Sequence, residues 1–457
     1  MPMLAKLRQG RVFIPKRLGF NGASLRDPTM TFTPEQLLTH LPQPDPMAPS
    51  RWWVGFSGGL DSAVLLHALV QLQLPVQICA LHVNHQISPH ADDWQAHCEA
   101  LAARLGVAFY AEKVWVINRG KGIEDAARQA RYHIFEQYLA PHDCVLTAHH
   151  ADDQAETLLL RLMRGTGPRG LAAMAGKRPL GQGWLVRPLL SFSRKLLEDY
   201  ARIHRLVWVD DESNTDLHYD RNYLRQQLLP LLQTRWPGFQ RKWQQTAELC
   251  AANEQLLEEL AQEDLGCLDE RAERLGRSIS LDKWLAMSEA RRRNLLRYWL
   301  RIQHFAVPEQ LHWQQLQQQL TLAREDAQVH ITWDQVSLRV YRQRLYVMPK
   351  HAKPGLLQWC TANQGAGRLR ADLPTLDIRL RQGGERCRPA GRSHSQTLKK
   401  LLQEAGIEPW LREQLPLVYS GEELVAVGDC WICDGFEAEE GQPGYRLQWV
   451  MPSASRQ

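Results

Sequence analysis

The stretch "VGFSGGLDSAVLLHALV", residues 54–70, decides the fold of this chain. It begins as a short apolar strand, turns at two adjacent glycines and continues as an amphipathic helix. A glycine-rich turn between a strand and a helix presents backbone N–H groups and a helix N-terminus to an anion. The stretch therefore predicts a phosphate-binding loop, although it lacks the lysine that many such loops carry.

The loop offers a carboxylate in place of that lysine. The predicted phosphate-binding residues are Ser57, Gly58, Gly59, Leu60, Asp61 and Ser62. A carboxylate beside phosphates is favourable when it holds Mg²⁺, because the cation bridges the two anions. We therefore expect Asp61 to be a ligand of Mg²⁺. The alternative is an ordinary strand-to-helix turn in which Asp61 or Ser62 only caps the helix.

The segments that follow alternate between strands and helices. Apolar strands are predicted at 51–56, 76–83, 107–114 and 143–150, and helices at 61–73, 92–106 and 122–140. Continuous apolar strands separated by helices are typical of a parallel sheet that is covered on both faces. We predict a doubly wound α/β domain over residues 30–235.

The rest of the chain has a different pattern. Residues 240–325 read as helices, and "VHITWDQVSLRVYRQRLYVM" at 329–348 alternates as a hairpin does. Prolines and glycines make residues 350–370 look like a linker. We predict a mainly helical domain over 236–350 that ends in the hairpin, and a small basic α+β domain over 370–455.

Composition places the chain among ordinary globular proteins. Of its 457 residues, 44% are hydrophobic and 23% charged, with a net charge of +5. No apolar run approaches the ~18 residues that span a membrane. The nine cysteines indicate reduced thiols and a cytosolic protein, and we expect Cys430 and Cys433 in "CWIC" to be packing residues. Residues 1–29 are basic and aperiodic, so we expect a disordered extension, or a true start at Met30.

Acid–base chemistry is predicted at the end of the last strand, in "TAHHADDQAE", residues 147–156. If a helix begins near Ala151, Asp152 and Glu156 share one of its faces and Asp153 lies beside it. His149 and Asp153 then flank a ligand at the carboxyl end of the sheet, where doubly wound folds bind ligands. We expect catalytic roles for Asp61, His149, Asp152 and Asp153, with His150 and Glu156 as further acid–base candidates and the identity of the general base left open. Helix capping is the alternative and is compatible with catalysis.

Further polar residues are expected to contact substrates. Candidate contacts to a nucleotide or a small substrate are His82, Asn84, Glu124, Arg128 and Glu156, with loop capping or a solvated ion-pair face as the alternative. Candidate contacts to RNA phosphate are Arg221, Arg225, Arg386, Arg388, Lys399 and Lys400. Between residues 376 and 402 basic side chains far outnumber the acidic Asp377 and Glu385, which favours an RNA-binding surface there. Arg221 and Arg225 have an alternative as partners of Asp210, Asp211 and Glu212.

The motifs together resemble a known family. "SGGLDS" is similar to the signature of the PP-loop, or N-type, ATP pyrophosphatases. "LHVNHQIS" at 81–88, "GIEDAARQARY" at 122–132, "TAHHADDQAETLLLRLMRGTGPRGLAAM" at 147–174, "RPLL" at 187–190 and "DESNTDLHYDRNYLR" at 211–225 narrow the resemblance to bacterial tRNA(Ile)-lysidine synthetases. "GGERCRPAGRSHSQTLKKLLQEAGIEPWLREQLPLVYSGEELVAVG" resembles the last domain of that family. The match covers nearly everything from Met30 onward.

The resemblance implies an activity. Family members use ATP with Mg²⁺ to adenylate the wobble cytidine of the isoleucine tRNA with anticodon CAU, and free L-lysine then displaces AMP. It also implies a PP-loop ATP-binding domain, tRNA-contacting middle and C-terminal domains, a cytoplasmic location and no obligate protein partner. One alternative is a PP-loop tRNA thiolation enzyme, although the α/β domain has no CxxC pair. The other is a non-catalytic RNA-binding protein switched by a nucleotide.

Overall fold

The structure, a computed structural model, describes residues 31–43, 50–116, 122–209, 216–322, 329–352 and 354–451. The predicted extension over residues 1–29 lies outside these ranges. The chain divides into two compact units, residues 1–254 and 255–457, and each is described by itself. Within the described ranges, no helix is both long enough and apolar enough to cross a membrane.

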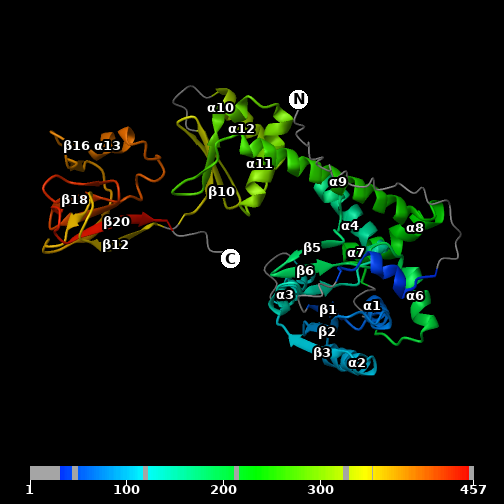
Figure 1. The fold of residues 1–457 in the computed structure, drawn as a ribbon. Helices are drawn as coiled ribbons and strands as arrows, with labels where there is room; N and C mark the ends of the chain where they lie inside the picture. Colours follow the sequence, from blue (N-terminus) through cyan, green and yellow to red (C-terminus); the bar gives the residue numbers. More distant parts are fainter. Residues whose placement is uncertain are drawn as a thin grey trace, which may run out of the picture. The chain divides into compact units, whose positions relative to one another are not determined.

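The first unit is built on a six-stranded sheet in the order β3-β2-β1-β4-β6-β5 (Figure 1). Its strands are β1 (Arg51–Gly55), β2 (Gln77–Asn84), β3 (Ala108–Lys113), β4 (Cys144–Leu146), β5 (Lys177–Leu180) and β6 (Gly183–Val186). All neighbours are parallel except β5, which runs antiparallel to β6 at the edge. Val54 lies opposite Ala80 on one side and Leu146 on the other, so β1 occupies the middle of the sheet.

Helices cover both faces of this sheet. The helices of this unit are α1 (Leu60–Gln71), α2 (Ala91–Arg104), α3 (Ile123–Tyr138), α4 (Ala151–Met163), α5 (Pro168–Leu171), α6 (Arg194–Ile203), α7 (Asp220–Tyr223) and α8 (Leu229–Arg235), with a short 3₁₀ helix at Pro34–Thr39 and a π-helical turn at Leu224–Leu228. Successive strand residues point to opposite faces. Trp52 and Val54 pack in one buried cluster with Leu65, whereas Trp53 packs in another with Phe135. The predicted doubly wound architecture is confirmed.

The second unit begins within the long helix α9 (Phe239–Gly266). Three further helices follow, α10 (Leu281–Leu285), α11 (Glu289–Ile302) and α12 (Gln310–Leu322). They share a core, including Trp284, Trp299 and Leu338, with a sheet of order β7-β8-β11-β10-β9. Its strands are β7 (Arg271–Ala272), β8 (Arg277–Ser280), β9 (His330–Trp333), β10 (Val336–Tyr341) and β11 (Arg344–Pro349). The predicted hairpin is thus part of a larger antiparallel sheet, because β8 pairs with β11.

The C-terminal segment is mainly antiparallel strands with one helix. Its elements are β12 (Leu356–Ala362), β13 (Leu369–Arg370), β14 (Asp377–Leu380), β15 (Arg386–Cys387), β16 (Gln396–Thr397), α13 (Leu398–Glu404), β17 (Pro416–Ser420), β18 (Glu423–Val427), β19 (Trp431–Ile432) and β20 (Gly444–Val450). The predicted linker over 350–370 is wrong in part. Residues 356–362 form β12, which pairs along its whole length with β20.

Candidate active site

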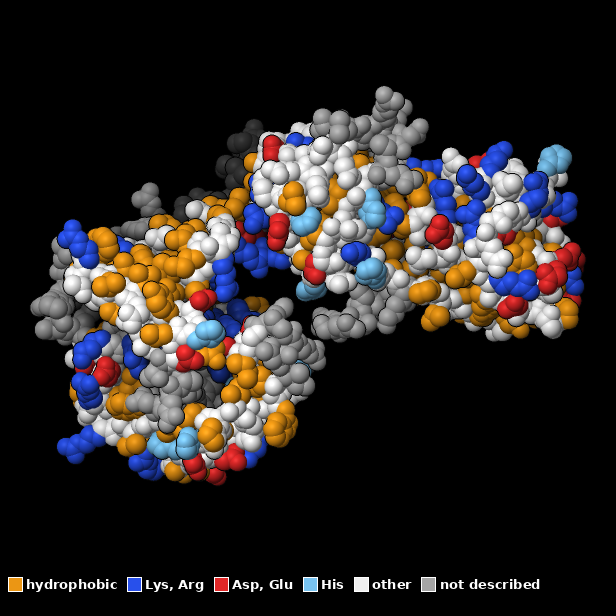
Figure 2. Space-filling model, turned by 180° about the vertical axis from the view of Figure 1, so that it is seen from behind, with side chains coloured by type: hydrophobic (Ala, Val, Ile, Leu, Met, Phe, Trp, Pro, Cys, Tyr) orange, Lys and Arg blue, Asp and Glu red, His pale blue; other side chains and the backbone are white. Residues whose placement is uncertain are grey.

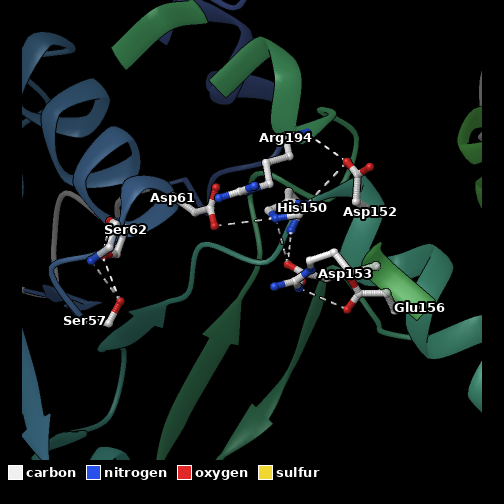
Figure 3. Close-up of polar contacts among 10 residues, drawn as sticks. Ser57, Asp61, Ser62, His150, Asp152, Asp153, Glu156 and Arg194 are labelled. Atoms are coloured by element: carbon white, nitrogen blue, oxygen red, sulfur yellow. Dashed lines mark hydrogen bonds and ion pairs between the residues drawn. The ribbon is translucent and has the colours of Figure 1, made fainter. Parts of the chain in front are cut away.

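The phosphate-binding loop joins β1 to α1 and is held by its own side chains. The Ser62 hydroxyl donates to the Gly59 carbonyl at 3.0 Å and lies 3.2 Å from the Ser57 hydroxyl (Figure 3). Gly58 has a φ of +80°, and a Cβ at this position would lie 2.6 Å from the Cys98 sulfur. The loop therefore requires glycine at this position, both for its backbone conformation and for its close approach to α2.

A cavity of about 590 Å³ opens at the carboxyl ends of β1, β2 and β4. The predicted site residues that line it are Ser57, Gly59, Asp61, Ser62, His82, Asn84, Glu124, Arg128, His149, Asp153, Arg221 and Arg225. Gly58, Leu60, Asp152 and Glu156 are not among the lining residues. The carboxyl edge of a doubly wound sheet is where such folds bind their ligands, and the cavity brings the phosphate loop and the acid–base motif together there.

His150 connects three carboxylates beside the cavity (Figure 3). Its side chain is only 2% exposed, and its Nε2 lies 3.6 Å from Asp61 Oδ2 and 3.4 Å from Asp153 Oδ2. Its Nδ1 lies 3.6 Å from Asp152 Oδ2. Burial opposes a charge on the ring, but the three carboxylates outweigh it and raise the pKa of His150 to about 10. A buried imidazolium therefore balances much of the negative charge of this cluster.

Asp61 suits a magnesium ion that also contacts phosphates. Its Oδ1 is buried and has no hydrogen-bond partner among the described residues. No group of three His, Cys, Asp or Glu side chains in the described ranges is arranged to hold a metal. Mg²⁺ commonly takes one or two carboxylates and completes its shell with water and substrate phosphates. The free oxygen of Asp61 fits that mode of binding.

Asp152 and Glu156 support the site from outside the cavity. Asp152 accepts a hydrogen bond from the Arg194 backbone N–H at 2.8 Å, which ties the start of α6 to α4. Glu156 is fully buried and accepts two bonds from Arg225, at 2.8 and 3.2 Å, while Arg225 also donates to Asp153 at 3.1 Å. Burial and the Asp153 carboxylate raise the pKa of Glu156. Arg225 therefore links two acids beside the cavity, whereas the sequence predicted that Arg225 contacts RNA phosphate.

His149 faces the cavity as a neutral ring. Its Nδ1 lies 2.9 Å from the Thr147 hydroxyl. Burial, followed by the nearby charges of Arg187, Arg128 and Arg131, lowers the pKa of His149 to about 3. For Asp153, burial favours the neutral form, but the His150 ring and the hydrogen bond from the His150 backbone N–H lower the pKa of the carboxyl below its usual range. The cavity thus presents a neutral imidazole beside an ionised carboxylate.

Hydrogen bonds from two side chains hold the end of β2 to its neighbours. Asn84 is buried and donates to Asp92 at 2.9 Å and to Gln95 at 3.0 Å, while its own oxygen accepts from the Gln86 backbone N–H at 3.0 Å. These bonds use the side chain fully, which favours the loop-capping interpretation of Asn84. His82 places its Nδ1 2.9 Å from the Phe56 carbonyl and so ties β2 to the end of β1.

The far wall of the cavity comes from α3 and the segment around α7. Arg221 Nε lies 3.9 Å from Glu124 Oε1, so these two predicted residues face each other. The acidic residues 210–212, proposed from the sequence as alternative partners, lie outside the described residues. Trp94 and Tyr219 also line the cavity, and neither was predicted. Tyr219 directly precedes the polar run Asp220–Arg221–Asn222, and this position in the sequence could have indicated that it lines the site.

The basic cluster of the C-terminal segment is largely paired. Arg388 forms an ion pair with Asp434, Lys400 lies 3.9 Å from Glu404, and Arg386 donates to the Ser395 carbonyl at 2.9 Å. Arg392 also pairs with Glu404, and Arg379 with Asp377 and Glu422. Figure 2 shows acidic and basic side chains mixed on the visible face of this part. The fold therefore supplies acids from beyond residue 402 that the local charge pattern did not include.

The cysteines do not form a CxxC centre. Cys433 Sγ lies 2.9 Å from Cys387 Sγ, and both are buried, whereas Cys430 Sγ lies 3.9 Å from an Asp429 oxygen. Among the described residues of the α/β fold, Cys79, Cys98 and Cys144 are buried core residues. No cysteine lines the cavity in the part of the chain that the structure describes.

Comparison with known proteins agrees with this geometry. Residues 30–232 match the PP-loop domain family, residues 279–346 the TilS substrate binding domain and residues 376–449 the TilS substrate C-terminal domain. The fold and the loop thus define an ATP-using enzyme of the PP-loop class. A solved U34-tRNA thiolase, NcsA from Methanococcus maripaludis, is 15% identical with a TM-score of 0.40 over 48% of this chain and 77% of that chain, too distant to indicate function.

Two curated relatives extend over nearly the whole chain. The tRNA(Ile)-lysidine synthase of Coxiella burnetii is 38% identical over 444 residues, which cover 92% of this chain and 97% of that protein. The tRNA(Ile)-lysidine synthase of Serratia proteamaculans is 42% identical over 417 residues, or 87% of this chain and 94% of that protein. The chain belongs to the tRNA(Ile)-lysidine synthase family. It is an enzyme that uses ATP to form lysidine on tRNA(Ile).

Proposed function

We propose that this enzyme joins free L-lysine to the wobble cytidine of the CAU-anticodon tRNA(Ile) in two steps within one cavity. In the first step the cytidine O2 attacks the α-phosphate of ATP, and pyrophosphate leaves. In the second step the lysine ε-amine attacks C2 of the activated ring, and AMP leaves with the oxygen. The observation that carries the proposal is a single cavity lined by the SGGLDS loop, His149 and Asp153.

The loop residues suit the first step. The N–H groups between Ser57 and Ser62 and the N-terminus of α1 favour the negative charge that builds up on the departing pyrophosphate. Asp61 is the proposed ligand of Mg²⁺, which would neutralise phosphate charge when bound. Because no γ-phosphate is transferred, the lysine of a kinase-type loop is not needed.

The acid–base residues suit the second step. An amine must lose its proton before it attacks, so an ionised carboxylate at the cavity wall favours the reaction. Asp153 lines the cavity and is held ionised, whereas Asp152 is turned toward Arg194, so we assign the proton-accepting role to Asp153. Glu124 suits the lysine ammonium groups, and Arg128 or Arg221 suits the lysine carboxylate.

The proposed partners follow from the reaction. They are tRNA(Ile), free lysine, ATP and Mg²⁺, and the site of action would be the cytoplasm, where all four are present. The middle and C-terminal segments would hold the tRNA, since all the nucleotide and acid–base motifs lie before residue 226.

Omitting lysine tests the two-step scheme. With ATP labelled at the α-phosphate and a tRNA(Ile) transcript bearing CAU, we expect label to become attached to the tRNA and an equal amount of pyrophosphate to form. Adding unlabelled lysine should then release the label as AMP. Pyrophosphate release that is independent of tRNA, or label that lysine does not discharge, would contradict the scheme.

A further inference from the structure

A second, open cavity of about 300 Å³ lies beside the active site, between α3 and the edge strand β5. From α3 it is lined by a stripe with helical spacing that includes Arg128, Tyr132 and Glu136, and from β5 by Arg178 and Leu180. Arg128 and Tyr132 line the active-site cavity as well. One wall, made of an arginine and a tyrosine, therefore separates the two cavities and faces both.

Arginines converge on that tyrosine. The guanidinium carbons of Arg128 and Arg178 lie 5.2 and 5.1 Å from the centre of the Tyr132 ring, within cation–π range. Arg187 donates to the Tyr132 hydroxyl at 3.4 Å. Arg178 donates one N–H group to the Pro179 carbonyl at 3.1 Å. Stacking on a ring fixes the plane of a guanidinium and leaves its other N–H groups available to a further partner.

The positive charge of this group is not balanced by ion pairs. Among the described residues, no carboxylate pairs with Arg128, Arg178, Arg187 or their neighbour Arg161. Arg161 and Arg187 donate instead to backbone carbonyls, at 2.7 Å to Ala173 and Ala175 respectively. Burial raises the pKa of Tyr132, but the charges of Arg128, Arg187 and Arg178 outweigh it and lower that pKa.

Two acidic side chains also line the second cavity. Asp125 accepts a hydrogen bond from Gln129 at 2.8 Å, and Glu136 lies there without an ion pair among the described residues. The C-terminal basic cluster differs, because most of its arginines are paired with carboxylates. The arginines around Tyr132 thus differ from the C-terminal basic cluster in having no carboxylate partner among the described residues.

We propose that the second cavity is a seat for the phosphate backbone of the tRNA next to the wobble nucleotide, with Arg178 as its outer contact and Arg128 as the contact shared with the active site. The proposal rests on the proposed function, because it assumes that the wobble base enters the first cavity. A nucleotide whose base is bound there places its neighbouring phosphates within one or two backbone units of the wall. Arginine binds phosphate through two parallel N–H donors, which matches a stacked guanidinium.

A purely structural role gives a different expectation. Charged residues on an edge strand prevent that edge from pairing with another sheet, and Lys177 and Arg178 lie on such a strand. In that case changing Arg178 affects aggregation and leaves the kinetics with tRNA unchanged.

The test uses the full-length enzyme with Arg178→Glu, Arg178→Lys and Arg104→Glu. Arg104 is the matched control, because it is exposed on the same unit and lines neither cavity. For R178E we expect the KM for the tRNA(Ile) transcript to rise about tenfold, as removal of a charge-assisted hydrogen bond implies. The log–log salt dependence of tRNA binding should flatten by roughly 0.7. R178K should keep the salt dependence but lose part of the affinity, because lysine lacks the paired donors, and R104E should keep both.

The same assays separate failure of this proposal from failure of the proposed function. KM values for ATP and for lysine should stay within about twofold of wild type in R178E, since the nucleotide loop and Asp153 are untouched. Normal lysidine formation with an unchanged tRNA KM and salt slope in R178E would overturn the phosphate seat alone. An equal rise in tRNA KM for R104E would also overturn it, because the effect would then be general electrostatics. Absence of lysidine formation in the wild type would instead contradict the proposed function.

Discussion

Replacing Gly58 with alanine tests whether the phosphate loop is rigid before its ligand arrives. Gly58 combines a φ of +80° with a position at which a Cβ would lie 2.6 Å from the Cys98 sulfur. The backbone conformation alone costs a residue with a Cβ roughly 1–2 kcal/mol. Forcing an atom into a packed interior costs typically about 1–3 kcal/mol more. We therefore expect Gly58→Ala to destabilise the loop by about 2–5 kcal/mol.

Two further variants separate the backbone cost from the steric cost. Gly106 has a φ of +67°, and a Cβ at this position would meet no atom within 4 Å, so Gly106→Ala should show only the backbone cost. Cys98→Ala removes the sulfur, so the double variant Gly58→Ala/Cys98→Ala should recover much of the steric cost. A double-mutant cycle then gives a favourable coupling of about 1–3 kcal/mol.

The assay follows the loop directly. Amide hydrogen exchange over residues 54–70 reports the local free energy of opening, and pyrophosphate release gives the KM for ATP. We expect Gly58→Ala to show faster exchange in this segment and a higher KM for ATP, both partly reversed in the double variant. If Gly58→Ala behaves like Gly106→Ala and Cys98→Ala brings no relief, the reasoning about close packing is refuted.

Four other changes test separate parts of the account. Asp61→Ala should abolish tRNA-dependent pyrophosphate release while leaving the circular dichroism spectrum unchanged, and wild-type turnover would remove Asp61 from the mechanism. His149→Gln should reduce the loss of folding stability at acid pH. Because the fold lowers the pKa of His149 to about 3, the contribution of the neutral ring to stability is complete above about pH 6.5 and is lost as the pH falls toward 3. Thermal melts from pH 7 to 4 that show no difference from wild type would contradict this. Deleting residues 1–29 should leave lysine incorporation unchanged, since the PP-loop match begins at residue 30, and a large loss of activity would show that the extension takes part. Changing Arg386, Arg388, Lys399 and Lys400 together to alanine should raise the KM for tRNA. The log–log salt dependence of tRNA binding should flatten by roughly 0.7 to 0.9 for each phosphate interaction that is removed. The kcat at saturating tRNA should stay close to wild type, and an unchanged KM would contradict the expectation.

The structure refines the last of these expectations. Arg388 and Lys400 already have carboxylate partners, whereas no partner of Lys399 is seen among the described residues. Most of the effect should therefore come from Arg386 and Lys399. The four single variants distinguish this distribution from an equal one.

Local pattern was sufficient for the catalytic fold. The apolar strand, the two glycines and the helix in residues 54–70 each carry their structure within a few residues, so β1, the loop and α1 were predictable. The parallel sheet followed from the alternation of strands and helices, and its confirmation by Trp52 and Trp53 packing on opposite faces needed only the period of a strand.

The site was predictable in position but less so in role. Motif spacing placed Asp152, Asp153 and Glu156 at the start of α4, yet it did not show that Glu156 is buried under Arg225 or that Asp152 caps α6. Those roles depend on partners 42 and 69 residues away. The same reason explains why the sequence offered His150 only as one acid–base candidate and did not show that this N-cap residue joins three carboxylates.

Charge patterns were the least reliable signal. Between residues 376 and 402 the sequence shows a nearly uncompensated basic run, but Glu404, Glu422 and Asp434 neutralise much of it in the fold. The arginines around Tyr132 show the converse, because they come from separate elements and loops and no local window contains them together. Compensation of charge is a property of tertiary structure.

Incorporation of labelled lysine into tRNA tests the central claim most directly. The full-length protein is incubated with ATP, Mg²⁺, labelled L-lysine and transcripts of tRNA(Ile) bearing CAU. The tRNA is then digested to nucleosides, which are separated and identified by mass spectrometry. The account predicts one lysine attached to the wobble cytidine for each AMP and each pyrophosphate formed, and none on a transcript in which that cytidine is replaced by uridine. Label at another position, a stoichiometry other than one to one, or incorporation without ATP would contradict it.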